Sequence, residues 1–211
     1  RASVRALRET PYPGLTNNNI IEVLIFGGSQ GASVFGRVLP EAIRRLDKNL
    51  RIRLKLVQQC RIEDCAQLKS SYNQLGLRAE ISTFFEDLPE RMARAHLVVS
   101  RAGASAIAEL TTIGRPAILV PYPHAIDDHQ SGNAYTLDEV GGGWLIPEEA
   151  FTPQSLSHRL QTLLSMPRTL DNAARASKRA GQPNAAAKLA EMVMDIIPRN
   201  SVDQLEARSV A

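Results

Sequence analysis

The sequence predicts an α/β fold in which a Rossmann-like parallel sheet of about six strands carries helices on both faces. Short apolar runs of strand length alternate with segments of helical length, as in consecutive βαβ units. Small residues, many of them glycine, follow two of the apolar runs and mark tight turns from strand to helix. The chain has 211 residues, of which 44% are hydrophobic, so it can form one domain with a buried core or half of a two-domain enzyme.

The elements follow one another in a regular order. Strands are expected at residues 20–26, 53–58, 79–84, 97–99, 117–120 and 144–146, where apolar residues concentrate. Helices are expected from the end of the first glycine turn to about residue 46, at 62–74, within 85–95, and at 105–113, 132–140, 153–164, 170–180 and 185–197. Pro40 is expected to kink the first helix or to begin a new first turn.

Both ends of the chain differ from this pattern. Residues 1–19 contain prolines, a glycine and an asparagine triplet without a sustained period, so we expect an interdomain linker. Residues 199–211 are polar and are expected to form a frayed tail. The chain begins with Arg1 instead of methionine, and we therefore expect part of a longer protein or a processed one.

Composition argues against several classes of function. The net charge is only +3 and basic residues are interspersed with acidic ones, which favours solvated surfaces over nucleic-acid binding. The longest apolar runs are shorter than the roughly 20 residues of a membrane-spanning helix, so we expect this piece to be soluble. Cys60 and Cys65 lack partners at metal-binding spacing. We expect reduced thiols, as in a cytoplasmic protein, with a disulfide as the alternative. His96 and His158 are expected at the surface.

Two strand-to-helix turns are candidates for binding an anion. Residues 27–32, GGSQGA, resemble a phosphate-binding turn because missing side chains let a phosphate approach backbone N–H groups, although packing alone also favours glycine there. They match neither GxGxxG nor the P-loop. Residues 100–104, SRAGA, precede a helix from Ser105 whose free N–H groups and dipole face the turn. Both turns would leave the carboxyl edge of a parallel sheet, where ligands bind.

Glu109 has two interpretations. It lies one helical turn beyond Ser105, where its carboxylate could accept hydrogen bonds from ligand hydroxyls. Alternatively, it is a surface glutamate paired with Arg101 or Arg115. Position alone does not decide between these interpretations.

The loop after the fifth strand carries further polar candidates. Asp127 and Asp128 could be a catalytic carboxylate pair or could cap the helix that follows. His124 and His129 could line a pocket. No spacing of histidine, cysteine and carboxylate residues is that of a metal site, and we expect neither a metal nor a cofactor.

Four motifs occur in a fixed order along the chain. They are GGSQGA at 27–32, SRAGASAIAEL at 100–110, GRPAILVPYP at 114–123 and DDHQSGNA at 127–134. In this order and spacing, over nearly the whole chain, the sequence resembles the C-terminal half of the bacterial MurG family. These are UDP-N-acetylglucosamine transferases that glycosylate lipid I to make lipid II. The resemblance implies one half of a GT-B fold, with residues 20–198 as the UDP-GlcNAc-binding domain.

The resemblance also implies which residues bind UDP-GlcNAc. Glu109 would bind the ribose hydroxyls, Phe85 would turn its backbone to the uracil, and Gln130 would bind GlcNAc hydroxyls. Ser29 would contact the diphosphate region, and Arg1 would match an arginine near the uracil. Further implied contacts are Ala104, Ser105, Ala106, Ile107 and Ala108, with Gly28, Gln30, Gly103, His129 and Asn133 as secondary candidates.

The implied reaction is an inverting, metal-independent transfer in which an acceptor hydroxyl attacks the anomeric carbon and UDP leaves. Backbone N–H groups at the second turn and Ser29 would stabilise the charge that develops on UDP. The family's glycine loop and catalytic histidine belong to an N-terminal domain outside this chain, so the chain is expected to bind donor without turnover and to hold no catalytic residue. Lipid I and the inner-membrane surface would be partners of the full protein, which would be peripheral at the cytoplasmic face.

Two alternatives remain open from the sequence. One is the donor-binding subunit of another family 28 glycosyltransferase, acting on dolichol-linked or glycolipid acceptors. The other is a non-catalytic module that binds nucleotide sugars.

Overall fold

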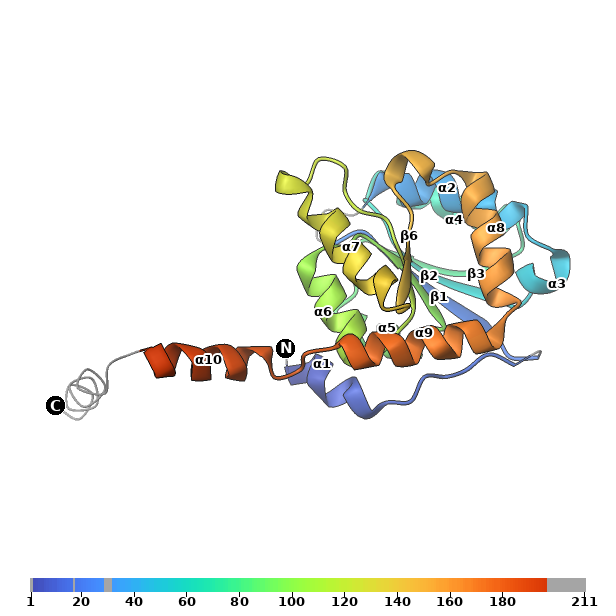
Figure 1. Ribbon diagram of the computed structural model, residues 1–211. Helices are drawn as coiled ribbons and strands as arrows, with labels where there is room; N and C mark the ends of the chain where they lie inside the picture. Colours follow the sequence, from blue (N-terminus) through green and yellow to red (C-terminus); the bar gives the residue numbers. More distant parts are fainter. Residues whose placement is uncertain (1, 17, 29–31, 197–211) are drawn as a thin grey trace. The chain divides into compact units, whose positions relative to one another are not determined.

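A six-stranded parallel sheet forms the centre of the first compact unit, Arg1–Gly181 (Figure 1). The computed structural model describes residues 2–16, 18–28 and 32–196. The strands are β1 (Ile21–Phe26), β2 (Leu54–Gln59), β3 (Arg78–Ser82), β4 (Leu97–Ser100), β5 (Ala117–Leu119) and β6 (Gly143–Leu145). Neighbouring strands are parallel throughout, and the predicted fold class is confirmed.

Alternation along β1 shows why helices cover both faces of the sheet. Ile21, Val23 and Ile25 belong to one buried cluster, whereas Leu24 and Phe26 belong to the other, because successive side chains of a strand point to opposite faces. The first cluster packs on α2 (Ser33–Arg44), α4 (Cys65–Gln74) and α8 (Pro153–Leu164), and the second on α5 (Leu88–Arg94), α6 (Ala104–Ile113) and α7 (His129–Glu139).

Successive strands are added on opposite sides of β1, first on one side and then on the other. The strand order is β3-β2-β1-β4-β5-β6, so β2 and β3 lie on one side of β1 while β4, β5 and β6 lie on the other. Phe26 at the end of β1 is in register with Ser100 at the end of β4. The turns after these two strands therefore begin side by side, at the point where parallel α/β sheets form a ligand-binding crevice.

Part of the expected linker is folded onto the sheet domain. It contains α1 (Ala2–Ala6) and a 3-10 turn, η1 (Leu7–Glu9). Val4 is buried in the second cluster, and the guanidinium of Arg8 donates to the carbonyl oxygen of Thr112 at 3.2 Å. A helix of five residues is too short for a helical period to be visible in the sequence.

Arg115, in the short segment between α6 and β5, joins several backbone segments. It is fully buried and donates to the carbonyl oxygens of Pro11, Ala93, Ile113 and Gly114 at 2.5 to 3.1 Å. Burial lowers the pKa of its guanidinium to about 10. The arginine therefore satisfies carbonyl groups at the ends of α5 and α6 that their helices leave unpaired.

His96 is buried, and its expected surface position is wrong. Only 6% of the residue is exposed, and its Nδ1 accepts a hydrogen bond of 3.0 Å from the backbone N–H of Glu22. Desolvation lowers the pKa of the imidazole below its ordinary value of 6.5. His158 is exposed, as expected.

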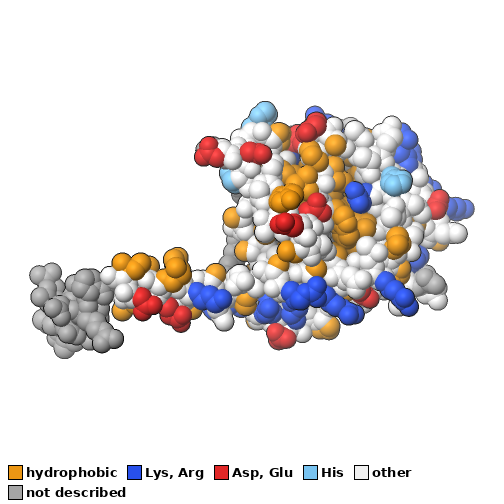
Figure 2. Space-filling view, in the orientation of Figure 1, with side chains coloured by type: hydrophobic (Ala, Val, Ile, Leu, Met, Phe, Trp, Pro, Cys, Tyr) orange, Lys and Arg blue, Asp and Glu red, His pale blue; other side chains and the backbone are white. Residues whose placement is uncertain are grey.

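Basic side chains gather on α9 (Pro167–Ala180), which packs against both α6 and α8 (Figure 2). Its buried face consists of Leu170 and small residues, among them Ala173 and Ala174, while Arg168, Arg175 and Arg179 are exposed. The arrangement is that of an amphipathic surface helix. Three short elements complete the unit: α3 (Lys48–Arg51), η2 (Ile126–Asp128) and η3 (Glu148–Ala150).

The second unit, Gln182–Ala211, contains α10 (Ala185–Ile196). Its apolar side chains are exposed, including Leu189, Met192 and Ile196. Across the described ranges, no helix combines the length and apolarity needed to cross a membrane. The domain limits expected from the sequence, 20–198 with a tail at 199–211, remain a prediction.

Candidate functional site

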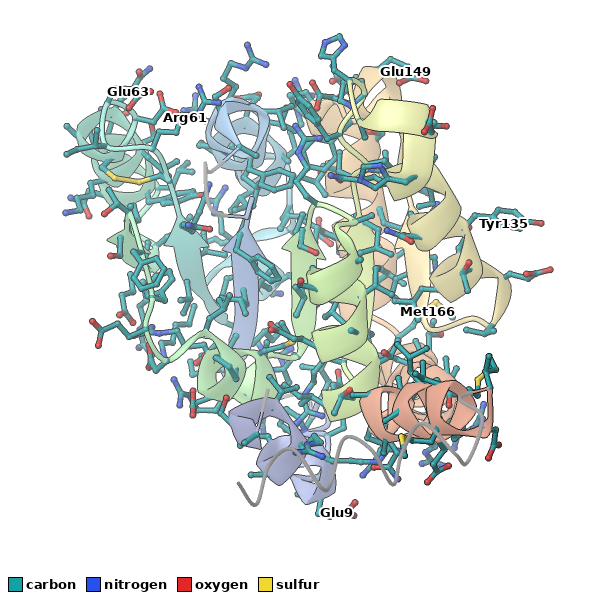
Figure 3. All side chains as sticks on the ribbon, turned by 90° about the vertical axis from the view of Figure 1, so that its left-hand side faces the viewer. Glu9, Arg61, Glu63, Tyr135, Glu149 and Met166 are labelled. Carbon is teal, nitrogen blue, oxygen red and sulfur yellow. A yellow bond between two sulfur atoms is a disulfide. The ribbon has the colours of Figure 1, made fainter. Side chains whose placement is uncertain are left out.

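A pocket of about 760 Å³ opens at the carboxyl ends of the strands. In Figure 3, Arg61 and Glu149 lie at this end of the sheet, whereas Glu9 lies at the opposite end. The lining residues come from the turns after β1 and β4 and from the segments after the other strands. They are Phe26, Gly27, Gly28, Ala32, Ser33, Val34, Arg37, Gln59, Arg61, Phe84, Phe85, Glu86, Leu88, Pro89, Arg101, Gly103, Ala104, Ser105, Ala106, Glu109, Tyr122, Gln130 and Glu148.

The N-terminus of α6 forms part of the pocket wall. Gly103 occupies the N-cap position and has no side chain with which to cap the helix. The first backbone bond of the helix is donated by Ile107 to the Gly103 carbonyl, at 3.1 Å. The N–H groups of Ala104, Ser105 and Ala106 precede that bond and therefore lie beyond the reach of the helix's own carbonyls. The sequence prediction of an uncapped helix start is confirmed, one residue earlier than expected.

The N-terminus of α2 lines the same pocket. Its N-cap residue is Ala32, which also lacks a capping group, and Ser33 and Val34 contribute to the wall. Each helix end favours an anion by about 0.3 to 1 kcal/mol when exposed to solvent. Two such ends at neighbouring strands suit a ligand with more than one negative charge.

Glu109 and Gln130 add polar side chains to this wall. Glu109 is largely buried, one turn inside α6, and faces the pocket. The two arginines considered as its partners have other contacts, because Arg101 pairs with Glu148 and Arg115 bonds backbone carbonyls. Gln130 belongs to α7, and its Oε1 accepts a hydrogen bond of 3.1 Å from the backbone N–H of Tyr122.

Phe85 enters the pocket from the segment after β3. Its side chain is buried in the second cluster, and the guanidinium of Arg91 lies 4.2 Å from the centre of its ring. Arg91 also contacts the carboxylates of Asp87 and Glu80, at 2.6 and 2.8 Å, and lowers the pKa of both. With the ring held inward, the backbone of Phe85 is the part left to face a ligand.

The structure brings together eight of the residues predicted from the sequence. Those lining the pocket are Gly28, Phe85, Gly103, Ala104, Ser105, Ala106, Glu109 and Gln130. Those that do not line it are Ile107, Ala108, His129 and Asn133. The remaining three, Arg1, Ser29 and Gln30, lie outside the described residues. Asn133 instead donates its Nδ2 to the Ala102 carbonyl at 3.0 Å. The binding roles of all these residues remain predictions.

The loop before α7 does not show the side-chain capping that one interpretation of its carboxylates predicted, and the catalytic interpretation stays a prediction. The helix begins at His129, three residues before the expected start, and Asp128 occupies the N-cap position with a positive φ of 50°. The Asp128 carboxylate accepts a bond of 2.6 Å from the Ser131 hydroxyl and does not cap a backbone N–H. His124 does not line the pocket, although the sequence allowed it.

Several pocket residues were missed by the sequence analysis, chiefly Arg101, Tyr122, Glu148 and the exposed Phe84. Arg101 lies within the SRAGA turn, where the sequence suggests it only as a possible partner of Glu109. Glu148 follows the last strand, and only the strand order places the ends of β4, β5 and β6 beside one another. A correct prediction of the strand order would therefore have placed these residues at the pocket.

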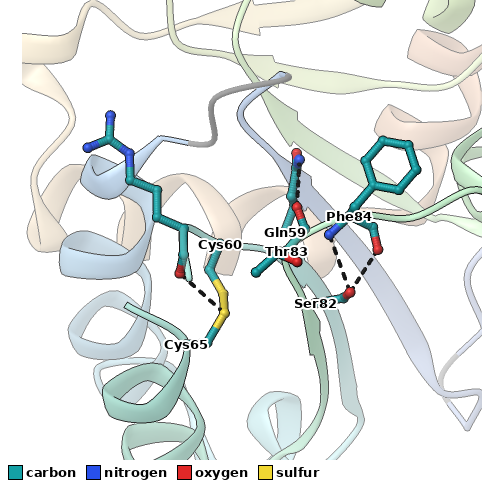
Figure 4. The surroundings of a disulfide bond; sticks show 7 residues. Gln59, Cys60, Cys65, Ser82, Thr83 and Phe84 are labelled. Carbon is teal, nitrogen blue, oxygen red and sulfur yellow. Dashed lines mark hydrogen bonds between the residues drawn. A yellow bond between two sulfur atoms is a disulfide. The ribbon is translucent and has the colours of Figure 1, made fainter. Parts of the chain in front are cut away.

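Cys60 and Cys65 form a disulfide with Cα atoms 5.9 Å apart, so the expectation of reduced thiols is wrong (Figure 4). Cys60 follows β2, and its N–H donates to the Ser82 carbonyl at 3.0 Å. The turn between the cysteines folds back so that Cys65 Sγ lies 3.2 Å from the Arg61 carbonyl oxygen. The bridge closes a short loop between β2 and α4, and Arg61 in this loop reaches the pocket.

Residues 22–189 match the model described as the glycosyltransferase family 28 C-terminal domain. The chain belongs to glycosyltransferase family 28. Within residues 2–16, 18–28 and 32–196, this family 28 domain contains no group of three or more His, Cys, Asp or Glu residues suited to a metal ion.

Two relatives of this family 28 domain carry the same name, UDP-N-acetylglucosamine–N-acetylmuramyl-(pentapeptide) pyrophosphoryl-undecaprenol N-acetylglucosamine transferase. The protein of Paramagnetospirillum magneticum is 48% identical over 201 residues, covering 95% of this chain and 54% of the relative. That of Rhodospirillum rubrum is 51% identical over 197 residues, covering 92% and 50%. The chain therefore spans about half the length of the curated relatives it matches.

Among solved structures, the family 28 domain is similar to MurG of Acinetobacter baumannii. The TM-score is 0.79 at 28% sequence identity, and the match covers 87% of this chain and 55% of the other. The agreement extends the family assignment from sequence to the arrangement of the sheet and its helices.

Proposed function

We propose that this chain is the donor-binding half of a transferase that moves GlcNAc from UDP-GlcNAc to lipid I, giving lipid II. The observation that carries the proposal is the pocket at the β1–β4 switch point, where two uncapped helix N-termini meet a buried glutamate and a glutamine. The names of the relatives, which specify a UDP-N-acetylglucosamine donor and an undecaprenyl acceptor, support the same function.

Each part of a nucleotide sugar has a chemically suitable neighbour in the pocket. The N–H groups of Ala104 and Ser105 suit the diphosphate, and the Glu109 carboxylate suits the ribose hydroxyls. The Phe85 backbone offers polar groups for the edge of the uracil ring. Gln130, from α7, suits the hydroxyls of the sugar.

The same arrangement supports the chemical step. When an acceptor hydroxyl attacks the anomeric carbon, the bond to the diphosphate breaks and negative charge grows on the UDP oxygens. Backbone N–H groups at the start of α6, whose residues line the pocket, are held in place by the helix and would stabilise this charge without reorganisation. The base that takes the acceptor proton, the lipid I site and the contact with the cytoplasmic face of the inner membrane belong, in this proposal, to the rest of the protein.

Calorimetric titration of the chain tests the proposal. We expect UDP-GlcNAc to bind more tightly than UDP-GalNAc, UDP-glucose and NAD, and UDP to retain part of the affinity because the helix N-termini hold the diphosphate. Binding of NAD in preference to UDP-GlcNAc, or no binding of any of the uridine nucleotides, would refute a donor site.

The role of Glu109 is tested by Glu109→Ala. A lost charge-assisted hydrogen bond corresponds to about 1.5 to 3 kcal/mol, so affinity for both UDP and UDP-GlcNAc should fall about tenfold to 100-fold. The matched control is Glu139→Ala, at an exposed position at the end of α7. Unchanged UDP affinity in a folded Glu109→Ala chain would reject the ribose contact.

A further inference from the structure

Arg101 connects the carboxyl ends of three neighbouring strands. The residue follows β4, and its Nη1 donates to the carbonyl oxygens of Val120 and Pro121, after β5, at 3.2 and 2.9 Å. Its Nη2 lies 2.5 Å from Oε2 of Glu148, after β6. Only 12% of the Arg101 side chain is exposed, so these contacts form in a setting with little competition from water.

The segment held by Arg101 also holds the carboxamide of Gln130. The guanidinium carbon lies 5.3 Å from the centre of the Tyr122 ring, and the backbone N–H of Tyr122 donates to Gln130 Oε1 at 3.1 Å. An N–H group can bond only the oxygen of a carboxamide, so this contact fixes which way the amide of Gln130 is turned. The Nε2 group, which carries two N–H donors, is the end left for the pocket.

We propose that Arg101 and Glu148 form a positioning pair that presents Gln130 as a hydrogen-bond donor to the sugar of the bound nucleotide sugar. The inference rests on the proposed function, and it adds to it two residues and the polarity of the sugar contact. The guanidinium acts through the Pro121–Tyr122 backbone. Glu148 holds the guanidinium in place and balances its charge.

The geometry distinguishes this role from a direct contact between Arg101 and the diphosphate. Arg101 lines the pocket, but the hydrogens of its Nη1 are directed to two carbonyls and its Nη2 faces a carboxylate. A guanidinium already paired with Glu148 adds little net attraction for a phosphate. Loss of the pair should therefore weaken binding of the sugar part and leave binding of UDP nearly unchanged.

Arg101→Lys is the main variant, because an ammonium keeps the charge but cannot reach two carbonyls and a carboxylate with one planar group. We expect affinity for UDP-GlcNAc to fall by about tenfold and affinity for UDP to change less than about threefold, measured by calorimetry. Glu148→Gln should show the same selectivity to a smaller extent, since it removes the charge facing Nη2 but keeps the size and shape of the carboxylate. Arg179→Lys, on the exposed face of α9, is the control.

A double-mutant cycle with Gln130→Ala separates positioning from a merely structural effect. If Arg101 acts through Gln130, Arg101→Lys should weaken UDP-GlcNAc binding no further once Gln130 is alanine. Additive losses in the cycle, or equal losses for UDP and UDP-GlcNAc, overturn the inference while leaving the donor site intact. A wild-type chain that binds neither nucleotide overturns the proposed function itself, and thermal unfolding of every variant identifies losses due to misfolding.

Discussion

Introducing a carboxylate at Ala104 should change stability and nucleotide binding in opposite directions. Ala104 is the first residue of α6, is exposed, and lines the pocket. In the free chain, Ala104→Asp places a negative charge beside the positive end of the helix dipole, and it should stabilise the fold by about 0.3 to 1 kcal/mol. If this helix start binds the diphosphate, the same substitution should also lower the affinity for UDP. If it has only a structural role, the affinity for UDP should not change.

The binding penalty follows from the position of the new carboxylate. At about 5 Å from one phosphate charge, with an effective dielectric constant between about 20 and 80 at this partly exposed site, repulsion amounts to about 1 to 3 kcal/mol. UDP affinity should therefore fall by about fivefold to 150-fold, and the loss should shrink as salt is added.

Calorimetry gives the UDP affinity, and urea unfolding gives the stability of the free chain. Ala104→Asn is the matched control, because it has nearly the same shape without the charge. Equal UDP affinity of the Asp and Asn variants would show that this helix end does not bind the phosphates.

Three further predictions concern groups outside the pocket. Arg115→Met leaves backbone carbonyls at two helix ends without their donor, and it should lower the free energy of unfolding in urea by at least about 3 kcal/mol. Arg175→Met on the exposed face of α9 should change it by less than about 0.5 kcal/mol. Because the pKa of His96 is lowered in the folded state, the unfolded chain binds more protons below the ordinary pKa of 6.5. Stability should be constant above about pH 7 and fall by up to about 1.4 kcal/mol per unit as the pH decreases below 6.5, and a His96→Gln variant should lack this component. Cys65→Ser opens a small covalent loop and should lower the free energy of unfolding by about 2 kcal/mol, which corresponds to roughly 4 to 8 °C in thermal midpoint. Reductant should lower the thermal midpoint of the wild-type chain by a similar amount and leave that of the variant unchanged. An unchanged midpoint of the wild-type chain in reductant would contradict the prediction.

The sequence predicted the parts of the fold that depend on local pattern. The central strands β4 and β5 are short apolar runs because both of their faces are covered, and the run of β4 gives way to small residues where the chain turns into α6 at Gly103. The pocket residues from these turns could be predicted for the same reason. Their neighbours along the chain place them at one edge of a parallel sheet.

The contacts that were missed depend on pairs of residues far apart in sequence. Arg101 follows β4 and Glu148 follows β6, and the two side chains pair across the end of the intervening strand β5. Neither local segment contains a signal that predicts this pairing. His96 is buried because its ring bonds the backbone of Glu22 on the adjacent strand, which a residue-by-residue polarity scale does not include. The disulfide depends on how the turn after Cys60 folds back, and the spacing of the two cysteines was compatible with either state.

The small residues around the pocket have a consequence for mutagenesis. At Ala32, Gly103, Ala104 and Ala106 the groups offered to a ligand are amides of the main chain, which no side-chain substitution removes. An alanine scan would not detect the contribution of this part of the pocket, since most of its positions are already alanine or glycine. A Cβ at Gly103 would meet nothing within 4 Å, so even that substitution should fit. Loss of function here requires added bulk or added charge, and tolerance of alanine at these positions is no sign that the wall is dispensable.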